Sequence, residues 1–207
     1  VGWWMVKSGL NDNPYVSSYR LAFHLTNAVI ILNILFWLTL NSLRSKYINF
    51  FPNNYLECFI FFLILLLLTT IISGAFMAGS DAGKSFSTYP LMNGSIFPEN
   101  YFIEGYGFKN SFENIVAINF NHRWLATFTF IIIMTFVIYL YLSKKFIKHN
   151  TELLLIFVFG CLQFLLGILA LLSNVNIIYA NLHQINSMLF LGSIILIYHA
   201  VKKENIL

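Results

Sequence analysis

The sequence has few charged residues. Only 10% of its 207 residues are Asp, Glu, Lys or Arg, whereas a soluble domain carries about a quarter. It also has only 4 prolines and 11 glycines, which excludes a collagen-like or Pro/Gly-rich disordered chain. Hydrophobic residues make up 58% of the chain, with 22 phenylalanines. This composition excludes an ordinary soluble globular protein.

Cysteine is scarce as well. Cys58 and Cys161 are the 2 cysteines, both lie in or at the edge of apolar runs, and they form no CxxC pair. We therefore expect buried structural thiols rather than a cysteine metal site or a redox pair.

The chain contains four long runs without a charged residue. They cover residues 21–43, 58–80, 124–143 and 153–201. A transmembrane helix needs about 20 mostly apolar residues, so the last run is long enough for two. The sequence predicts an all-α polytopic membrane protein with helices at 19–43, 56–79, 118–142, 151–173 and 178–201. The apolar residues 1–6 are too few to cross a bilayer, so we expect them to end a further span that lies outside this sequence.

The charges between these runs predict their orientation. Lys and Arg gather in segments 44–55 and 143–152 and in the tail after residue 201, whereas loop 80–117 is the acidic segment. The positive-inside rule therefore places the basic segments on the cytoplasmic or matrix side. The basic residues form no patch interleaved with exposed aromatic residues, so the net charge of +4 does not indicate a nucleic-acid partner. Loop 80–117 is long for a connector and is expected to be a lid or a docking surface.

Asparagines mark the expected helix starts at the acidic side. Asn13 precedes Pro14, and Asn110 with Glu113 resembles a capping box,. Asn174 or Asn176 can cap the last helix.

Three histidines lie in the spans at a similar depth. Measured from these caps, His24, His122 and His183 are roughly 10–18 Å into their helices. Ionisable residues in membrane helices are costly and usually face the bundle interior. Any one of them could simply hydrogen-bond to a neighbouring helix. His149 and His199 lie near the basic side and are expected at the membrane interface.

The surroundings of the three histidines favour haem iron over other metals. Imidazole suits zinc, copper and iron, but no carboxylate lies in the spans at this depth,. Histidines from separate helices of an apolar, aromatic bundle fit the axial ligation of haem. His122 and His183 belong to one contiguous set of four spans and form the better pair, so His24 needs a partner outside this sequence.

Two arginines accompany the histidines. Arg20 is four residues before His24, and Arg123 follows His122 directly. Arginine binds carboxylates such as haem propionates through a fork of donors. The alternative is that both reach toward lipid headgroups.

A weak internal repeat relates the two ends of the chain. Residues 2–10 and 19–25 can be laid over residues 167–174 and 179–184, and in both cases a histidine follows a tyrosine on the returning helix. Duplicated halves with sites at corresponding positions are common in membrane proteins.

Several stretches in this order resemble the haem A synthase family. They are Gly2–Leu10 (GWWMVKSGL), Tyr19–Leu25 (YRLAFHL), Gly74–Gly83 (GAFMAGSDAG), Tyr89–Gly94 (YPLMNG), Asn119–Arg123 (NFNHR), Gln163–Gly167 (QFLLG) and Leu182–Gln184 (LHQ). Because the outer loop has no cysteine pair, the resemblance is to the mitochondrial and proteobacterial branch.

The resemblance implies two related four-helix bundles. Residues 1–43 would be the end of an N-terminal bundle that binds the substrate haem o, with His24 and Arg20 at that site. Residues 44–207 would form a complete C-terminal bundle with haem b as cofactor between His122 and His183, near Arg123. The family oxidises a methyl group of haem o to a formyl group, which gives haem A for cytochrome c oxidase. The other substrate-haem ligand and the catalytic acidic residue would lie outside this sequence, so we expect the chain alone to be inactive.

The resemblance also implies partners and a location. Expected partners are haem o, membrane lipid, an electron donor, haem o synthase and a second copy of the chain. The membrane would be the bacterial cytoplasmic or mitochondrial inner membrane, with the histidines near the periplasmic or intermembrane-space side.

Three rival functions remain open from the residues alone. A b-type cytochrome would use His122 and His183 to carry electrons but has no need of His24 with its own arginine. A transporter is disfavoured because spans 58–80 and 124–143 have no charge and no Gly/Pro break at mid-depth. In a purely structural assembly subunit, the three histidines would be coincidental.

Overall fold

Five long helices account for most of the chain. The computed structural model describes residues 1–9, 15–43, 48–144 and 146–204. Within these ranges, the helices long and apolar enough to cross a membrane are α2 (Ser18–Leu43), α3 (Tyr55–Gly79), α5 (Ile115–Leu142), α6 (Asn150–Leu172) and α7 (Ile177–Glu204). Their boundaries agree with the predicted spans to within about three residues. The prediction of an all-α polytopic membrane protein is confirmed.

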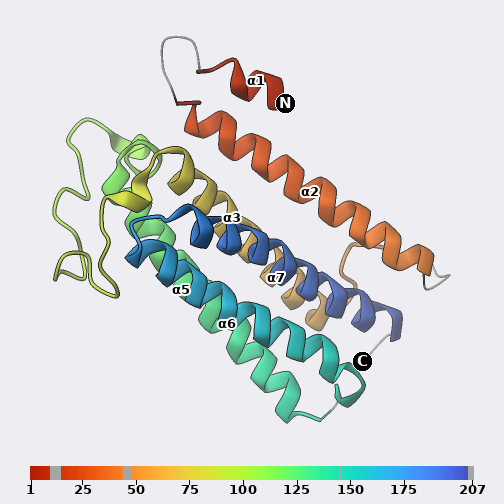
Figure 1. Ribbon diagram of the computed structural model, residues 1–207. Helices are drawn as coiled ribbons and strands as arrows, with labels where there is room; N and C mark the ends of the chain where they lie inside the picture. Colours follow the sequence, from red (N-terminus) through yellow and green to blue (C-terminus); the bar gives the residue numbers. More distant parts are fainter. Residues whose placement is uncertain (10–14, 44–47, 145, 205–207) are drawn as a thin grey trace.

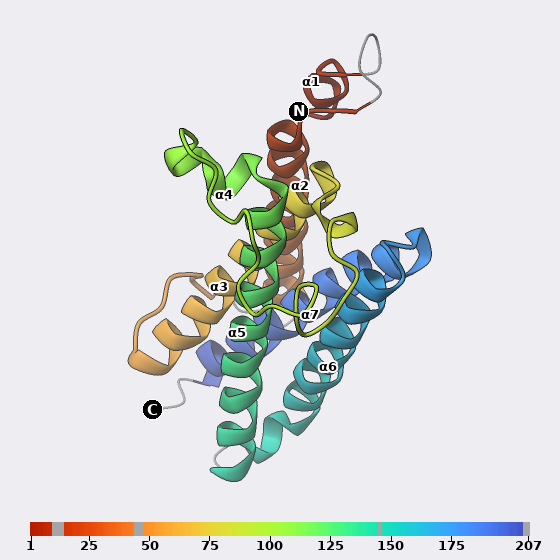
Figure 2. The ribbon, with the colours of Figure 1, turned by 90° about the vertical axis from the view of Figure 1, so that its left-hand side faces the viewer.

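The helices form one elongated bundle (Figure 1). α3, α5, α6 and α7 pack against one another, and α2 packs along α3 and α7. The short α1 (Gly2–Val6) contacts α2 beyond the bundle, as Figure 2 also shows. α5 and α7 begin at the same end of the bundle at which α3 and α6 end. We call this end, with residues 80–114, the loop end, and the opposite end, with residues 48–54, the linker end.

The loop end carries short helical turns between α3 and α5. They are η1 (Ala82–Lys84), η2 (Gly107–Lys109) and α4 (Asn110–Glu113), whereas η3 (Ile147–His149) precedes α6 at the linker end.

Asparagines cap two helices that begin at the loop end. The Asn176 Oδ1 accepts from the backbone N–H of Ile178 at 2.9 Å, as one of the two predicted alternatives requires. The Asn114 Oδ1 accepts from the backbone N–H of Val116 at 3.0 Å and starts α5. Such caps satisfy donors that the first turn leaves free. Asn13, the predicted cap of the first span, lies outside the described residues.

The prediction that Asn110 caps α5 is wrong. Asn110 is the first residue of α4, and its side chain turns back to the loop instead. Its Oδ1 accepts from the N–H of Ile103 at 3.0 Å, and its Nδ2 donates to the carbonyl oxygen of Tyr101 at 2.6 Å. The side chain of Asn110 does bond to backbone groups, as a cap would. Those hydrogen bonds stabilise the loop rather than the start of α5.

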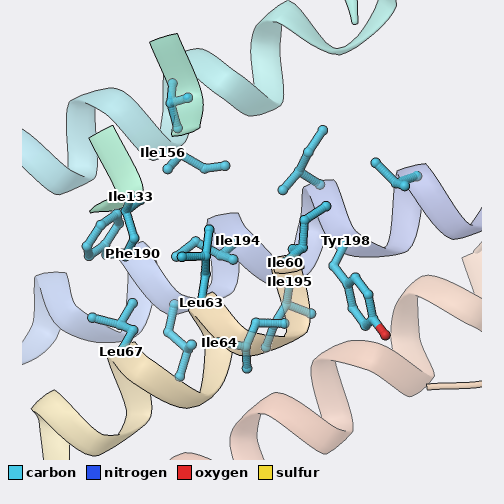
Figure 3. Packing of buried hydrophobic residues seen from close by; sticks show 14 of the residues in the cluster. Ile60, Leu63, Ile64, Leu67, Ile133, Ile156, Phe190, Ile194, Ile195 and Tyr198 are labelled. Carbon is cyan, nitrogen blue, oxygen red and sulfur yellow. The ribbon is translucent and has the colours of Figure 1, made fainter. Parts of the chain in front are cut away.

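A cluster of buried apolar side chains joins the four helices, and Figure 3 shows part of it. Isoleucine, leucine and aromatic side chains from α3, α5, α6 and α7 interdigitate there, among them Ile60, Leu63, Ile64, Leu67, Ile133, Ile156, Phe190, Ile194, Ile195 and Tyr198. In a membrane, close van der Waals packing of this kind holds helices together, because lipid is as apolar as the side chains.

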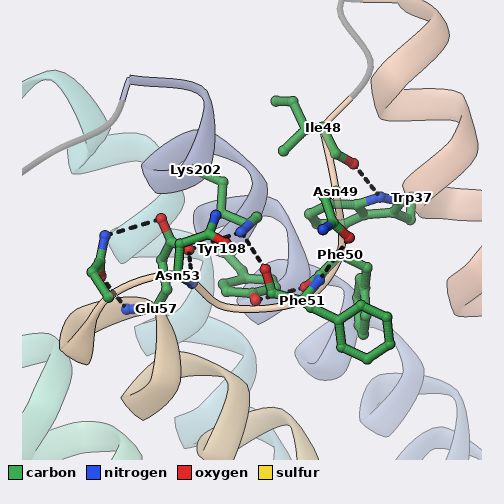
Figure 4. Close-up of polar contacts among 10 residues, drawn as sticks. Trp37, Ile48, Asn49, Phe50, Phe51, Asn53, Glu57, Tyr198 and Lys202 are labelled. Atoms are coloured by element: carbon green, nitrogen blue, oxygen red, sulfur yellow. Dashed lines mark hydrogen bonds and ion pairs between the residues drawn. The ribbon is translucent and has the colours of Figure 1, made fainter.

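A buried ion pair fastens the segment that joins α2 to α3 (Figure 4). Lys202 Nζ of α7 lies 2.8 Å from Glu57 Oε2 of α3, with side chains only 2% and 3% exposed. Lys202 also donates to the carbonyl oxygen of Phe51 at 2.7 Å. The hydroxyl of Tyr198 donates to the carbonyl oxygen of Phe50 at 2.7 Å. Two side chains of α7 thus bind backbone carbonyl oxygens of the linker.

α2 holds the same linker from the other side. Trp37 Nε1 donates to the carbonyl oxygen of Ile48 at 3.2 Å, and Asn41 Nδ2 lies 3.4 Å from the same oxygen. His199 Nε2 lies 2.9 Å from Asn41 Oδ1. Because His199 is fully buried and bonds α7 to α2, it is a core residue and not the interfacial residue that we expected. His149 is also buried.

Candidate functional site

A cavity of about 390 Å³ opens among the helices toward the loop end. Cofactor pockets are commonly about 300–1,000 Å³, mostly apolar with a few polar groups. His122 and Arg123 from α5 and His183 from α7 line this cavity together. The structure thus brings together the two histidines paired from the sequence. His24 is not among the lining residues, although Leu25, its neighbour on α2, is.

The three histidines lie at nearly the same depth in their helices. His24, His122 and His183 are six, seven and six residues after the first residues of α2, α5 and α7. At 1.5 Å rise per residue this is about 9–11 Å. The match is closer than the sequence suggested because α2 begins at Ser18 and α5 at Ile115, each five residues after the asparagine from which its depth was counted.

Each of these imidazoles lies against a glycine of a neighbouring helix. A Cβ atom placed on Gly74 would lie 3.1 Å from His122 Cε1, and one placed on Gly167 would lie 2.9 Å from His183 Cε1. A Cβ on Gly2 would lie 3.3 Å from His24 Cε1. Glycine therefore allows a ring to approach the helix backbone at all three positions. The shared contact is a structural counterpart of the repeat seen in the sequence.

Arg123, which lines the cavity, uses only part of its hydrogen-bonding capacity within the described residues. Its Nη2 donates to the carbonyl oxygen of Phe86 at 2.9 Å. Its Nε and Nη1 are buried and have no hydrogen-bond partner among the described residues. A buried guanidinium with unpaired donors is costly, and a carboxylate would satisfy it.

Arg20 has a different environment. Its Nη1 donates to the carbonyl oxygen of Trp4 at 2.9 Å, and the guanidinium carbon lies 4.6 Å from the centre of the Trp4 ring. The structure places Arg20 beside α1, away from the cavity that Arg123 lines.

The loop is fastened to the start of α5 above the cavity. Asn119 Nδ2 donates to the carbonyl oxygen of Ala82 at 2.7 Å, and the hydroxyl of Tyr101 donates to Asn121 Oδ1 at 2.9 Å. Tyr89, also from the loop, lines the cavity. With Arg123 bound to Phe86, the loop forms part of the cavity wall.

The two cavity histidines have different partners. The His183 ring contacts Gln163 of α6, whereas the His122 Nδ1 is buried without a hydrogen-bond partner among the described residues. Gln163 in turn bonds to Asn186. Gln163 was one of the residues in the family-like stretches, but Asn186 carried no signal except its place three residues after His183.

These residues fit a haem with two imidazole ligands. Bis-histidine haem takes its other four iron ligands from the porphyrin, so the protein need supply only two nitrogens from facing helices. The unpaired Arg123 donors fit a propionate. Within the described ranges, no three His, Cys, Asp or Glu residues cluster as a closed metal site would require.

Comparison with known proteins gives a family. Residues 1–195 match the COX15-CtaA family, described as cytochrome oxidase assembly protein. A heme A synthase of Pelagibacter ubique is 38% identical over 203 residues, which are 96% of this chain and 57% of the relative. One from Bartonella tribocorum is 37% identical over 186 residues, 89% of this chain and 51% of the relative. One from the Wolbachia of Culex pipiens is 37% identical over 193 residues, 93% of this chain and 56% of the relative.

The chain spans about half the length of these relatives. No solved structure matches it significantly. The family resemblance drawn from the sequence motifs is confirmed: the chain belongs to the COX15-CtaA family of cytochrome oxidase assembly proteins.

Proposed function

We propose that residues 44–207 bind haem b between His122 and His183. The observation that carries this proposal is that both histidines, from α5 and α7, line one cavity. A glycine on a facing helix makes room for each ring.

In this proposal each residue has one task. His122 and His183 bind the iron, and the apolar cavity walls exclude water. Arg123 pairs with a propionate through its free Nε and Nη1 while Nη2 stays bound to the loop. Bound haem b supplies one-electron redox chemistry.

We further propose that residues 1–43 contribute to a second, substrate site for haem o, with His24 as an iron ligand and Arg20 near it. The like environments of His24 and His183, each against a glycine, support this assignment. The reaction would be the oxidation of a haem o methyl group to the formyl group of haem A, because the relatives are named heme A synthase. Since the chain spans about half of those relatives, we expect it to bind haem b alone without making haem A.

The same proposal assigns sides and partners. The basic segments at the linker end would face the cytoplasm or matrix, and the histidines would lie near the periplasmic or intermembrane-space side. An electron donor, haem o synthase and a second copy of the chain are the proposed partners.

Haem extraction from cells that make haem o tests this function. We expect the chain alone to retain haem b and form no haem A. Joined to the first half of the Pelagibacter ubique relative, it should form haem A. His24→Ala in the joined chain should abolish haem A but leave haem b bound.

A b-type electron carrier is the alternative function. It predicts haem b binding with no haem A in any chain, and no effect of His24→Ala. That pattern would refute the enzyme assignment and leave the cofactor site intact. His149→Ala serves as a control, since His149 lies at the linker end in η3.

A further inference from the structure

Four helices contribute one residue each to the deep end of the cavity. Counted toward the linker end, these residues lie seven positions from the two cavity histidines and from the glycines that face them. They are Leu67 of α3 and Gly160 of α6, counted from Gly74 and Gly167, and Thr129 of α5 and Phe190 of α7, counted from His122 and His183. All four line the cavity. At 1.5 Å rise per residue, this floor layer lies about 10 Å along the bundle from the level of the histidines.

The floor layer is closely packed. A Cβ atom placed on Gly160 would overlap Met134 Cε and would lie 3.1 Å from Phe190 Cε2. Thr129 Oγ1 lies 2.8 Å from Thr70 Oγ1, and the Thr70 hydroxyl lies 2.9 Å from a backbone carbonyl oxygen of its own helix. Thr129 and Phe190 are each 2% exposed. The floor layer therefore has no gap beside its glycine, and its hydroxyls already bond within the protein.

A second layer lies behind the floor layer. Four residues further toward the linker end, each of the same helices carries a branched aliphatic side chain, and Figure 3 labels all of them: Leu63, Ile133, Ile156 and Ile194. These side chains are between 1% and 3% exposed, belong to one buried cluster, and are not among the residues that line the cavity. Because buried side chains pack as densely as organic crystals, this closing layer ends the cavity on the linker side.

Other side chains cover the flanks of the cavity. Phe130 of α5 and Phe164 of α6 both line it, and their rings stack with centres 4.6 Å apart and planes at 15°. Leu25 and Val29 of α2 line it on another side, where α2 packs along α3 and α7. A long substituent that points toward the linker end would therefore meet packed side chains.

Haem b and haem o differ at the edge of the macrocycle that faces this end. With the propionates at Arg123, the opposite edge of the ring, which carries the vinyl groups of haem b, points toward the floor layer. Haem o carries a long hydroxyethylfarnesyl chain in place of one vinyl group. We propose that the floor layer and the closing layer make this cavity selective for haem b over haem o. The inference rests on the proposed haem site, and such selectivity would keep a substrate haem out of the cofactor site.

Titration of the purified chain, prepared without haem in detergent micelles, tests the selectivity. Haem b and haem o are added separately, and the Soret absorption reports binding. We expect the wild type to bind haem b about 10–100-fold more tightly than haem o, the loss expected when a well-packed core must admit extra methylene groups. Equal affinities for the two haems would overturn the proposal.

A widened variant tests the two layers themselves. Phe190→Ala/Ile194→Ala removes one side chain from each layer on α7 and should lose most of the preference for haem b. The matched control is Ile60→Ala/Ile197→Ala, which truncates two side chains of the same buried cluster that do not line the cavity and should keep the preference. An unchanged preference in a folded Phe190→Ala/Ile194→Ala chain would contradict a steric floor.

The same titrations separate this inference from the proposed function. A wild-type chain that binds haem b and haem o equally well retains the proposed cofactor site and refutes only its selectivity. A folded wild-type chain that binds neither haem refutes the cofactor site, and the selectivity with it.

Discussion

The imidazole of His183 lies so close to Gly167 that a Cβ atom there would be 2.9 Å from Cε1. Real Cβ atoms essentially never approach another atom so closely, so a side chain at Gly167 would have to displace the ring. His183 also bonds to Gln163 on the same helix. The position of this ring is therefore set by α6 as much as by α7.

Gly167→Ala should reduce haem binding by moving His183. Alanine favours a helix over glycine by about 1 kcal/mol, so the helix itself is expected to survive. Haem content per purified chain is the measurement. Gly192→Ala is the control, because its Cβ would lie 3.9 Å from Phe36, an ordinary contact. Equal haem content in the two variants would contradict a packing role for Gly167.

Arg123→Gln should weaken haem retention, because it removes the buried donors proposed for a propionate. Charge-assisted hydrogen bonds are worth about 1.5–3 kcal/mol, which corresponds to about 10–100-fold in affinity. Transfer of haem to an excess of an acceptor protein measures the change. Lys84→Gln, which removes an exposed cation paired with Asp81, should retain haem as the wild type does. An Arg123→Gln chain that holds haem equally well would rule out the propionate contact.

Glu57→Gln should destabilise the linker end strongly. It leaves Lys202 buried without its carboxylate, and breaking a buried pair costs about 3–5 kcal/mol. Unfolding in mixed detergent micelles gives the free-energy difference. The double variant Glu57→Leu/Lys202→Met should lose less than the single variant, since no charge is then left buried. Glu99→Gln, at an exposed site, should change the free energy of unfolding little. An equally small effect of Glu57→Gln would mean that the Glu57–Lys202 pair does not stabilise the protein.

The membrane spans could be read from the sequence because lipid demands long uncharged runs. The start of α5 could not be predicted, because both Asn110 and Asn114 can cap a helix. Only the folded loop shows that the side chain of Asn110 is already hydrogen-bonded to the backbone of Tyr101 and Ile103.

Hydrogen bonds between helices, unlike the pairing of His122 with His183, could not be predicted from the sequence. His122 and His183 were paired by depth and side, and both line the cavity. The Gln163–Asn186 contact depends on the register of α6 against α7, which no periodicity fixes. The burial of His199 likewise follows from its contact with Asn41 on a distant helix.

The most direct test of the account is haem quantitation by pyridine haemochrome on the purified chain, with His122→Ala, His183→Ala and His24→Ala alongside. We predict about one haem b per chain in the wild type and in His24→Ala, and its loss in each of the other two variants. A folded, helical wild-type chain without haem would contradict the account, as would haem that persists in His122→Ala or His183→Ala.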